Sequence, residues 1–360
     1  MQMEPKNEYG VYPTLGEIWD YAIELGIRMG HRDARAVWQV CKRNKARYAR
    51  MSPERKRLFD KTGLTVPFGD CRIYAGRLSG RIRGLLAVID ATPEVALHIH
   101  ELNTKGGWNI DLLFAHHAGF KEVMYKGEDF CVPDARCLAQ LYGVSIESMN
   151  PIESEARKMA RIPGCGCGGP GSGDAVARQC MTVSGTAEMC RQMDVAHINI
   201  HTPCDVFLWR AVWDVLNAAG LTTCQDAIDV LYRIPEFRRF RQQHHQPIRM
   251  LTGKPRSRLG RWWNANCAAT LTLNEKSVRA IRDAGFDTMV GVIYEGKITE
   301  EANKHGLNVI HLPHYASDTL GINGLLDCLI ERWPSLDVLA HGAFFRVERP
   351  HCGAWATAAI

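Results

Sequence analysis

Three apolar segments of this chain each end in side chains that can bind a metal ion. The segments are Leu112-Leu113-Phe114-Ala115 before His116-His117, Ile198-Asn199-Ile200 before His201-Thr202-Pro203-Cys204-Asp205, and Val309-Ile310-His311-Leu312-Pro313 before His314-Tyr315-Ala316-Ser317-Asp318. In open α/β sheets, ligands bind outside the carboxyl ends of the strands. If these strands are neighbours, the three clusters meet in one site.

Imidazole and carboxylate ligands without an obligatory thiolate suit zinc, iron, manganese or cobalt, and argue against a structural four-cysteine zinc site. The adjacent His116 and His117 suit two neighbouring ions. Asp205, four residues after His201 at the start of a helix, could span both of them. Two ions about 3.5–4 Å apart polarise a substrate oxygen and activate water. The expected reaction class is therefore hydrolysis.

Each of these residues also has a more ordinary interpretation. A histidine at a strand end is usually a surface or hydrogen-bonded residue, and His244-His245 occurs without a strand before it. Asp205 and Asp318 could be plain carboxylates at helix N-termini, which is the commoner use of aspartate there. We interpret His201 and His197 as residues that orient ligands. His201 could also move a proton if it faces the site.

The order of elements indicates an α/β protein with a helical start. Thr14 and Glu17 form a capping box, and Ser52-Pro53 is typical of a second helix start. From Arg83 onward, apolar runs alternate with amphipathic stretches, which predicts mixed or parallel sheets flanked by helices. The predicted strands cover 85–89, 110–115, 195–200, 268–273, 289–293 and 307–312, and the predicted helices cover 93–106, 133–149, 206–220, two around 227–240, one after Asn274, 300–305 and 317–333.

The composition is that of a globular protein, with 46% hydrophobic and 23% charged residues in 360. No segment reaches the about 20 apolar residues of a membrane helix, and the start lacks a secretory signal pattern, so we expect a cytoplasmic protein. The 13 cysteines are scattered, which predicts reduced thiols without disulfides. The segment 162–173 is rich in glycine and cysteine and predicts a loop; Cys165 and Cys167 have no assigned role.

Two local clusters are basic, although the net charge of +5 is mild for this length. The first covers Lys42 to Arg57. The second runs from Lys254 to Trp262-Trp263 and mixes arginines with aromatic residues. A solvated helix face is the ordinary interpretation of the first cluster. The alternative is nucleic-acid binding through both, with phosphate contacts and base stacking.

Taken together, the three clusters resemble the Nif-three-like dinuclear metal proteins, also known as type 2 homologues of GTP cyclohydrolase I. The resemblance extends from about Leu85 to about Trp333, and the helical start resembles an extension found in some members. It implies that two metal ions are bound by a set of five residues, namely His116, His117, Asp205, His314 and Asp318. Glutamate is typical at the last position, so the shorter Asp318 would draw its metal closer to the helix or bind it through water.

The resemblance further implies two α/β lobes with the metals in the cleft, often assembled into a ring-shaped homohexamer. Residues 1–82 would form the helical extension, residues 83–220 with 307–360 the first lobe, which carries the metal site, and residues 221–306 the second lobe. The resulting hypothesis is a two-metal hydrolase acting on a small nucleotide-like or phosphorylated substrate. The alternative is a metal carrier or regulatory interaction protein that holds the same ions without turnover.

Overall fold

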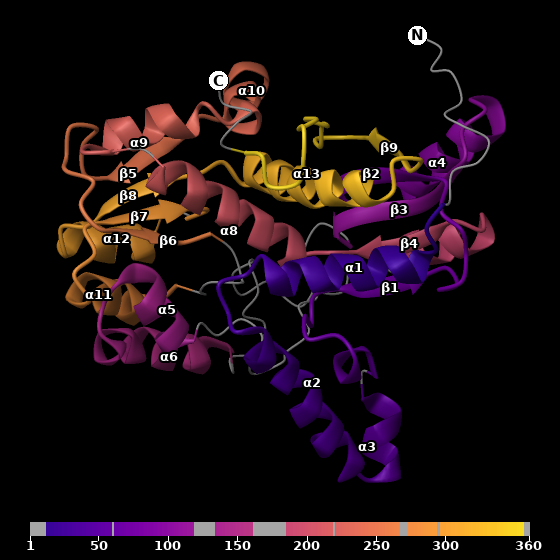
Figure 1. Cartoon of the computed structure of the whole chain (residues 1–360), viewed down its shortest axis with the longest axis horizontal. Helices are drawn as coiled ribbons and strands as arrows, with labels where there is room; N and C mark the ends of the chain where they lie inside the picture. The colour runs from indigo at the N-terminus through magenta and orange to yellow at the C-terminus, as the bar shows by residue number, and fades with distance from the viewer. Residues whose placement is uncertain are drawn as a thin grey trace.

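Two mixed β-sheets, each with helices on its faces, form the body of the protein (Figure 1). The computed structural model describes residues 12–59, 61–118, 134–160, 185–218, 220–266, 273–293 and 296–355. The first sheet has the strand order β1-β4-β3-β2-β9, with bounds of Arg72–Ala75 for β1, Gly84–Asp90 for β2, Ile110–His117 for β3, Ala196–Asn199 for β4 and Asp337–Ala340 for β9. Its strands are parallel except for β1.

The second sheet has the order β5-β8-β7-β6, and only its edge strand β5 is antiparallel. The strand bounds are Arg249–Thr252 for β5, Trp262–Asn264 for β6, Thr288–Gly291 for β7 and Asn308–His311 for β8. The predicted α/β class with mixed sheets is therefore confirmed. The strand predicted over 268–273 lies almost entirely outside the described residues, as does the glycine- and cysteine-rich segment 162–173.

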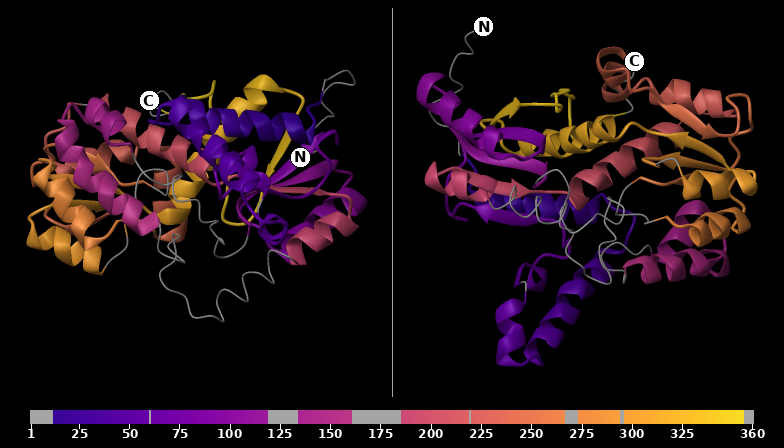
Figure 2. Two further views of the ribbon diagram at one scale, coloured as in Figure 1. Left: turned by 90° about the horizontal axis from the view of Figure 1, so that it is seen from below. Right: turned by 180° about the vertical axis from the view of Figure 1, so that it is seen from behind.

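The N-terminal region consists of α1 (Leu15–Arg28), α2 (Ala34–Ala49), α3 (Pro53–Leu58) and the short helix η1 (Lys61–Leu64). The capping box that starts α1 is present, with the Thr14 side chain accepting from the Glu17 amide. α1 shares a hydrophobic cluster with strands of the first sheet, whereas α2 and α3 project away from both sheets (Figures 1 and 2). The region expected to be wholly helical also supplies β1, whose four residues are too few for a recognisable alternation.

Further helices of the described residues flank the two sheets. They are α4 (Pro93–Lys105), α5 (Ala135–Tyr142), α6 (Ile146–Ala160), α9 (Cys224–Leu231), α10 (Pro235–His244), α11 (Glu275–Asp283) and α12 (Lys297–Lys304). The single helix predicted over 133–149 is broken into α5 and α6 because Gly143 adopts a left-handed conformation with φ of 63°. Among the helices of the described ranges, none is long and apolar enough to cross a membrane.

The course of the chain differs from the predicted division into lobes. β8 falls in the part assigned to the first lobe, yet it pairs with β5 and β7 of the second sheet. The helices α5 and α6 also share a hydrophobic cluster with residues of β7 and α11 rather than with the first sheet. These long-range pairings leave no local mark in the sequence.

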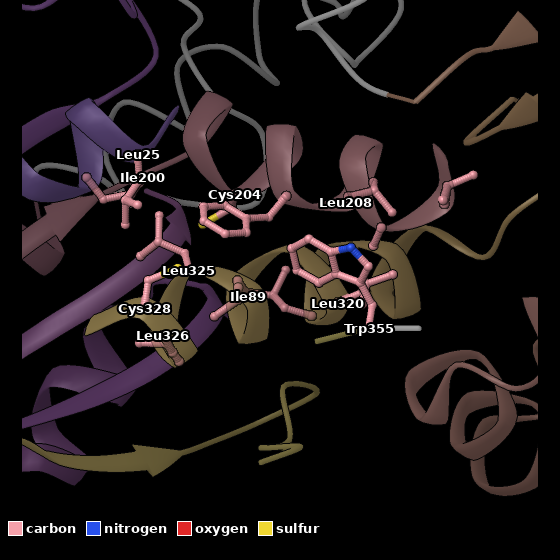
Figure 3. Close-up of a cluster of buried hydrophobic side chains, with 14 of the residues drawn as sticks. Leu25, Ile89, Ile200, Cys204, Leu208, Leu320, Leu325, Leu326, Cys328 and Trp355 are labelled. Carbon is pink, nitrogen blue, oxygen red and sulfur yellow. The ribbon is translucent and has the colours of Figure 1, made fainter. Parts of the chain in front are cut away.

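Two long helices, α8 (Thr202–Asn217) and α13 (His314–Arg332), pack against each other between the sheets. Figure 3 shows the apolar contact, in which Cys204 and Leu208 of α8 face Leu320 and Leu325 of α13. The approach is close at Gly321, where a Cβ atom would lie 2.5 Å from the carbonyl oxygen of Cys204. Gly321 therefore sets how near the two helices come.

Gly321→Ala is expected to destabilise the fold by about 1–3 kcal/mol, because the backbone of α8 must move to accept the methyl group. Urea unfolding measures this change. Gly220→Ala is the matched control, since nothing lies within 4 Å of a Cβ at Gly220. An equal, small effect of both substitutions would contradict the close packing.

The C-terminal tail folds back over α13 and brings Cys352 beside Cys328, with their Cα atoms 4.7 Å apart and their sulfurs bonded. This disulfide corrects the expectation that all cysteines are reduced. Among the other described cysteines, Cys41, Cys137, Cys190, Cys204 and Cys224 are free thiols. The tail is further held by ion pairs of Arg349 with Glu236 and of Arg346 with Asp327. Only the folded tail brings these partners together, so sequence spacing could not reveal them.

Candidate metal centre

The first two clusters meet because β3 and β4 are parallel neighbours, with Ala115 opposite Asn199. β3 ends at His116 and His117, and the chain leaving β4 turns at His201 into α8, whose first turn carries Asp205. The strand continues through His117, yet the ring centroids of His116 and His117 lie only 4.5 Å apart. Both imidazoles therefore reach one region without a turn between them.

The third cluster reaches the same region by another route. β8 belongs to the other sheet, but α13 begins at His314 directly after it and packs on α8. His314 and Asp318 lie one helical turn apart, so they share a face, and the Nε2 atom of His314 is 3.5 Å from Oδ1 of Asp318. The expectation of neighbouring strands is thus right for two clusters, and helix packing supplies the third.

Buried side chains form the inner part of this site. His116, Asp205, Asp318 and His201 are each 4% exposed or less. The Nε2 atom of His116 is 3.5 Å from Oδ1 of Asp205 and 3.7 Å from Oδ1 of Asp318. His201 stacks on His116 with a centroid distance of 4.4 Å, and its Nδ1 atom is 3.1 Å from Oδ2 of Asp205. Two carboxylates and two imidazoles are therefore packed together away from solvent.

The outer part of the site is more open. The side chains of His117 and His314 are 13% and 36% exposed. His117 donates through Nδ1 to Oδ1 of Asp90 at 3.0 Å, and the Tyr315 hydroxyl donates to Oδ2 of the same carboxylate at 3.2 Å. This bond leaves Nε2 of His117 available as a metal ligand. Within the described part of the cluster, this more exposed side is where a small molecule could approach.

Three overlapping groups of side chains could each hold an ion, because their ligand atoms lie within 4.8 Å of one another. The groups are His116 with His117 and His201, His117 with His314 and Asp318, and His116 with Asp205 and Asp318. All five residues of the predicted ligand set occur in them, and His201 occurs as a sixth. Two neighbouring ions would need side chains that contact both of them, and Asp318 belongs to two of the three groups.

The chemistry of the inner residues fits a cation. Burial raises the pKa of Asp318 to about 7, and burial together with the neighbouring imidazoles places the pKa of His116 well below its usual value. His116 is therefore neutral at pH 7, which is the metal-binding form of histidine. Its Nε2 atom and Oδ2 of Asp318 are buried without a hydrogen-bond partner. Such atoms are costly unless something satisfies them, and a metal ion would do so.

Two carboxylates around the site, Asp90 and Asp70, were not among the predicted residues. Asp90 ends the apolar strand β2 opposite His117, which is the same signal as in the three clusters and could have identified it. Asp70 accepts from the Thr202 hydroxyl at 2.6 Å and lies 3.0 Å from Nδ1 of His201. It precedes β1 in the region expected to be helical, so no local signal marks it. Each of these carboxylates contacts one histidine of the cluster: Asp90 contacts His117, and Asp70 contacts His201.

Asp90→Asn is expected to weaken metal binding by about 10- to 100-fold, the usual cost of losing the partner that orients a ligating histidine. The fold should be retained, because the asparagine keeps the size of the side chain. Metal titration against a chromogenic chelator measures the change. Asp111→Asn, at the opposite end of β3, serves as the control. Equal affinity of both variants would contradict the role of Asp90.

The two tryptophans of the second basic cluster lie in the interior. Trp262 is 9% exposed, and Trp263 is fully buried and stacks on Tyr142. Neither ring can stack on a base, so the base stacking expected of Trp262-Trp263 is wrong. The short strand β6 places these tryptophans in the interior, which the mixture of arginine and tryptophan residues did not predict.

The elements and the cluster together define an α/β protein with a candidate two-ion centre between two sheets. No protein-family model matches the chain, and no curated protein matches it in sequence. Among solved structures, the chain is similar to a NIF3 superfamily protein from Sphaerobacter thermophilus, with a TM-score of 0.54 and 18% identity over 91% of this chain and 98% of that one. This likeness shows that the chain has the fold of a NIF3 superfamily protein, as the resemblance of its motifs implies.

Two other solved structures are similar to the chain at lower scores. Reduced HcgD from Methanocaldococcus jannaschii has a TM-score of 0.46 and 12% identity over 80% of this chain and 94% of that one. A Bacillus cereus protein related to NIF3 has a TM-score of 0.39 and 11% identity over 83% of this chain and 96% of that one.

Proposed function

We propose that this protein is a dinuclear metal hydrolase of the Nif-three-like kind. The ligand set of His116, His117, Asp205, His314 and Asp318 would hold two divalent transition ions, such as zinc, iron, manganese or cobalt. The observation that carries the proposal is the buried contact of His116 with both Asp205 and Asp318, at 3.5 and 3.7 Å. Two ions bound there would polarise a substrate oxygen and lower the pKa of water.

The substrate proposed is a small phosphorylated or nucleotide-like compound. An anionic phosphoryl group complements a pair of cations, and the outer side at His117 and His314 is where it could enter. His201 would position Asp205 through their 3.1 Å contact and move a proton at its imidazole. Asp70 contacts Nδ1 of His201 and would fix the orientation of the imidazole ring. The chain thus supplies orientation and proton transfer, while the ions supply the electrophile.

Hydrolysis is tested by loading the purified protein with each metal and assaying nucleotides, phosphoesters and cyclic amides. His201→Gln is the informative variant, because it should keep both ions and lose most of the turnover. Asp205→Asn should lose metal and turnover together. If the fully loaded parent turns over nothing in the panel, the alternative of a metal carrier or regulatory protein replaces the hydrolase.

A homohexamer and a cytoplasmic location are part of the same proposal and rest on the resemblance and on the sequence. Light scattering coupled to size-exclusion chromatography tests the assembly. A monomer in both the metal-free and the metal-loaded protein would contradict the hexamer.

A further inference from the structure

A second candidate binding site lies on the arm formed by α2 and α3, away from the metal cluster (Figures 1 and 2). The two helices line an open surface pocket of about 780 Å³. Its lining consists of Arg43, Arg47, Arg50 and Arg55 together with Ala46, Met51, Ser52 and Phe59. This volume lies within the range of pockets that bind small ligands.

The pocket concentrates positive charge. The segment 42–57 contains eight lysines and arginines and one glutamate, a net charge of +7, whereas the whole chain has +5. In the described part of the chain, Arg47, Arg50 and Arg55 form no ion pair. Like charges three or four residues apart on a helix destabilise it by about 0.2–0.5 kcal/mol per pair. An anion between these arginines would offset that cost.

Part of the pocket lining is apolar. Ala46, Met51 and Phe59 contribute to the lining, and the Phe59 ring packs on Tyr48 with a centroid distance of 5.2 Å. Lys56 lies over the Tyr48 ring, with its Nζ atom 5.4 Å from the ring centroid. The aromatic pair is thereby held in place, and Phe59 offers a fixed apolar surface next to the arginines.

We propose that this pocket binds a nucleoside di- or triphosphate. Arginine forks bind phosphate oxygens in pairs, so several converging arginines suit adjacent phosphate groups. The surface of Phe59 and Met51 then suits the base. A nucleic-acid strand is the less fitting ligand, because it needs basic residues along an extended track, whereas these four converge on one concavity. The site shares no residue with the metal cluster and does not depend on the proposed hydrolysis.

The test is calorimetric titration of the full-length protein with a non-hydrolysable ATP analogue. Arg47→Gln with Arg50→Gln should weaken one binding event by at least about tenfold. Lys42→Gln with Lys45→Gln removes the same charge from positions outside the pocket lining. This double variant should change the affinity for the analogue by less than about twofold. Thermal unfolding of both double variants shows that each is folded.

Three outcomes would overturn the proposal. The first is the absence of any binding event that the pocket variant weakens. The second is an equal loss of affinity in both double variants, because that indicates attraction by the overall positive charge of the arm and no specific role for the pocket arginines. The third is tighter binding of a single-stranded oligonucleotide than of the analogue. Inorganic tripolyphosphate should bind more weakly than the analogue, and equal binding would contradict a role for the apolar surface.

Discussion

Asp205→Asn is expected to lower metal affinity by well over about 100-fold, more than the loss of an orienting residue costs. The asparagine has nearly the same shape, so the first turn of α8 should be kept. It lacks the negative charge, however, that would hold a cation beside His116, whose Nε2 atom is 3.5 Å from the carboxylate. It also withdraws the anionic partner of His201 at 3.1 Å. Chelator competition measures the affinity.

Asp214→Asn is the control, since Asp214 lies on the same helix and pairs with Arg210 and with Trp355 instead of the cluster. It should bind metal like the parent. If Asp205→Asn and the parent bind metal equally, Asp205 is a plain carboxylate of the helix start, which is its ordinary interpretation.

Asp318→Asn is expected to have opposite effects on metal binding and on the stability of the metal-free protein. Burial raises the pKa of Asp318 from 3.8 to about 7, so the folded state holds a proton that the unfolded state has lost. Its contribution therefore becomes more unfavourable as the pH rises from about 4 to about 7, and stays constant above that. Above pH 7 the ionised carboxylate costs about 4 kcal/mol, which the asparagine avoids.

The measurement is urea unfolding of parent and variant in the presence of a chelator, at pH 4.5 and pH 8. The metal-free variant should exceed the parent in stability at pH 8, and the difference between them should be much smaller at pH 4.5. The same variant should bind metal far more weakly, because it has lost a shared carboxylate. A variant that is less stable than the metal-free parent at pH 8 would contradict this account of Asp318.

Much of the candidate site could be predicted because its signals are local. An apolar run followed at once by His116-His117 marks the end of a strand, and the step from β4 into α8 is marked by Pro203, two residues after His201. Thr14 with Glu17, and Asn274, identify helix starts for the same reason: a capping side chain bonds a backbone amide three residues away. These patterns depend only on residues that are close in sequence, so they can be recognised whatever the arrangement of the lobes.

Other features depend on contacts that only the folded chain makes. The strands β1, β5, β6 and β9 were not predicted: they have three or four residues each and form the edges of the two sheets, whereas β4, β7 and β8, of similar length, lie inside the sheets and within longer apolar runs. β8 looks like a continuation of the first lobe, and only its pairing with β5 and β7 assigns it to the second sheet. Gly321 looks like an ordinary helix residue until the backbone of α8 is placed against it. Such features follow from packing between distant segments.

The central claim is that folding brings His116, His117, Asp205, His314 and Asp318 together around a pair of cations. Elemental analysis of the purified protein, beside His117→Ala prepared in the same way, tests it most directly. We predict about two transition ions per chain in the parent, as the two-ion centre requires, and a large loss in the variant. Equal trace amounts of metal in both preparations would contradict the claim.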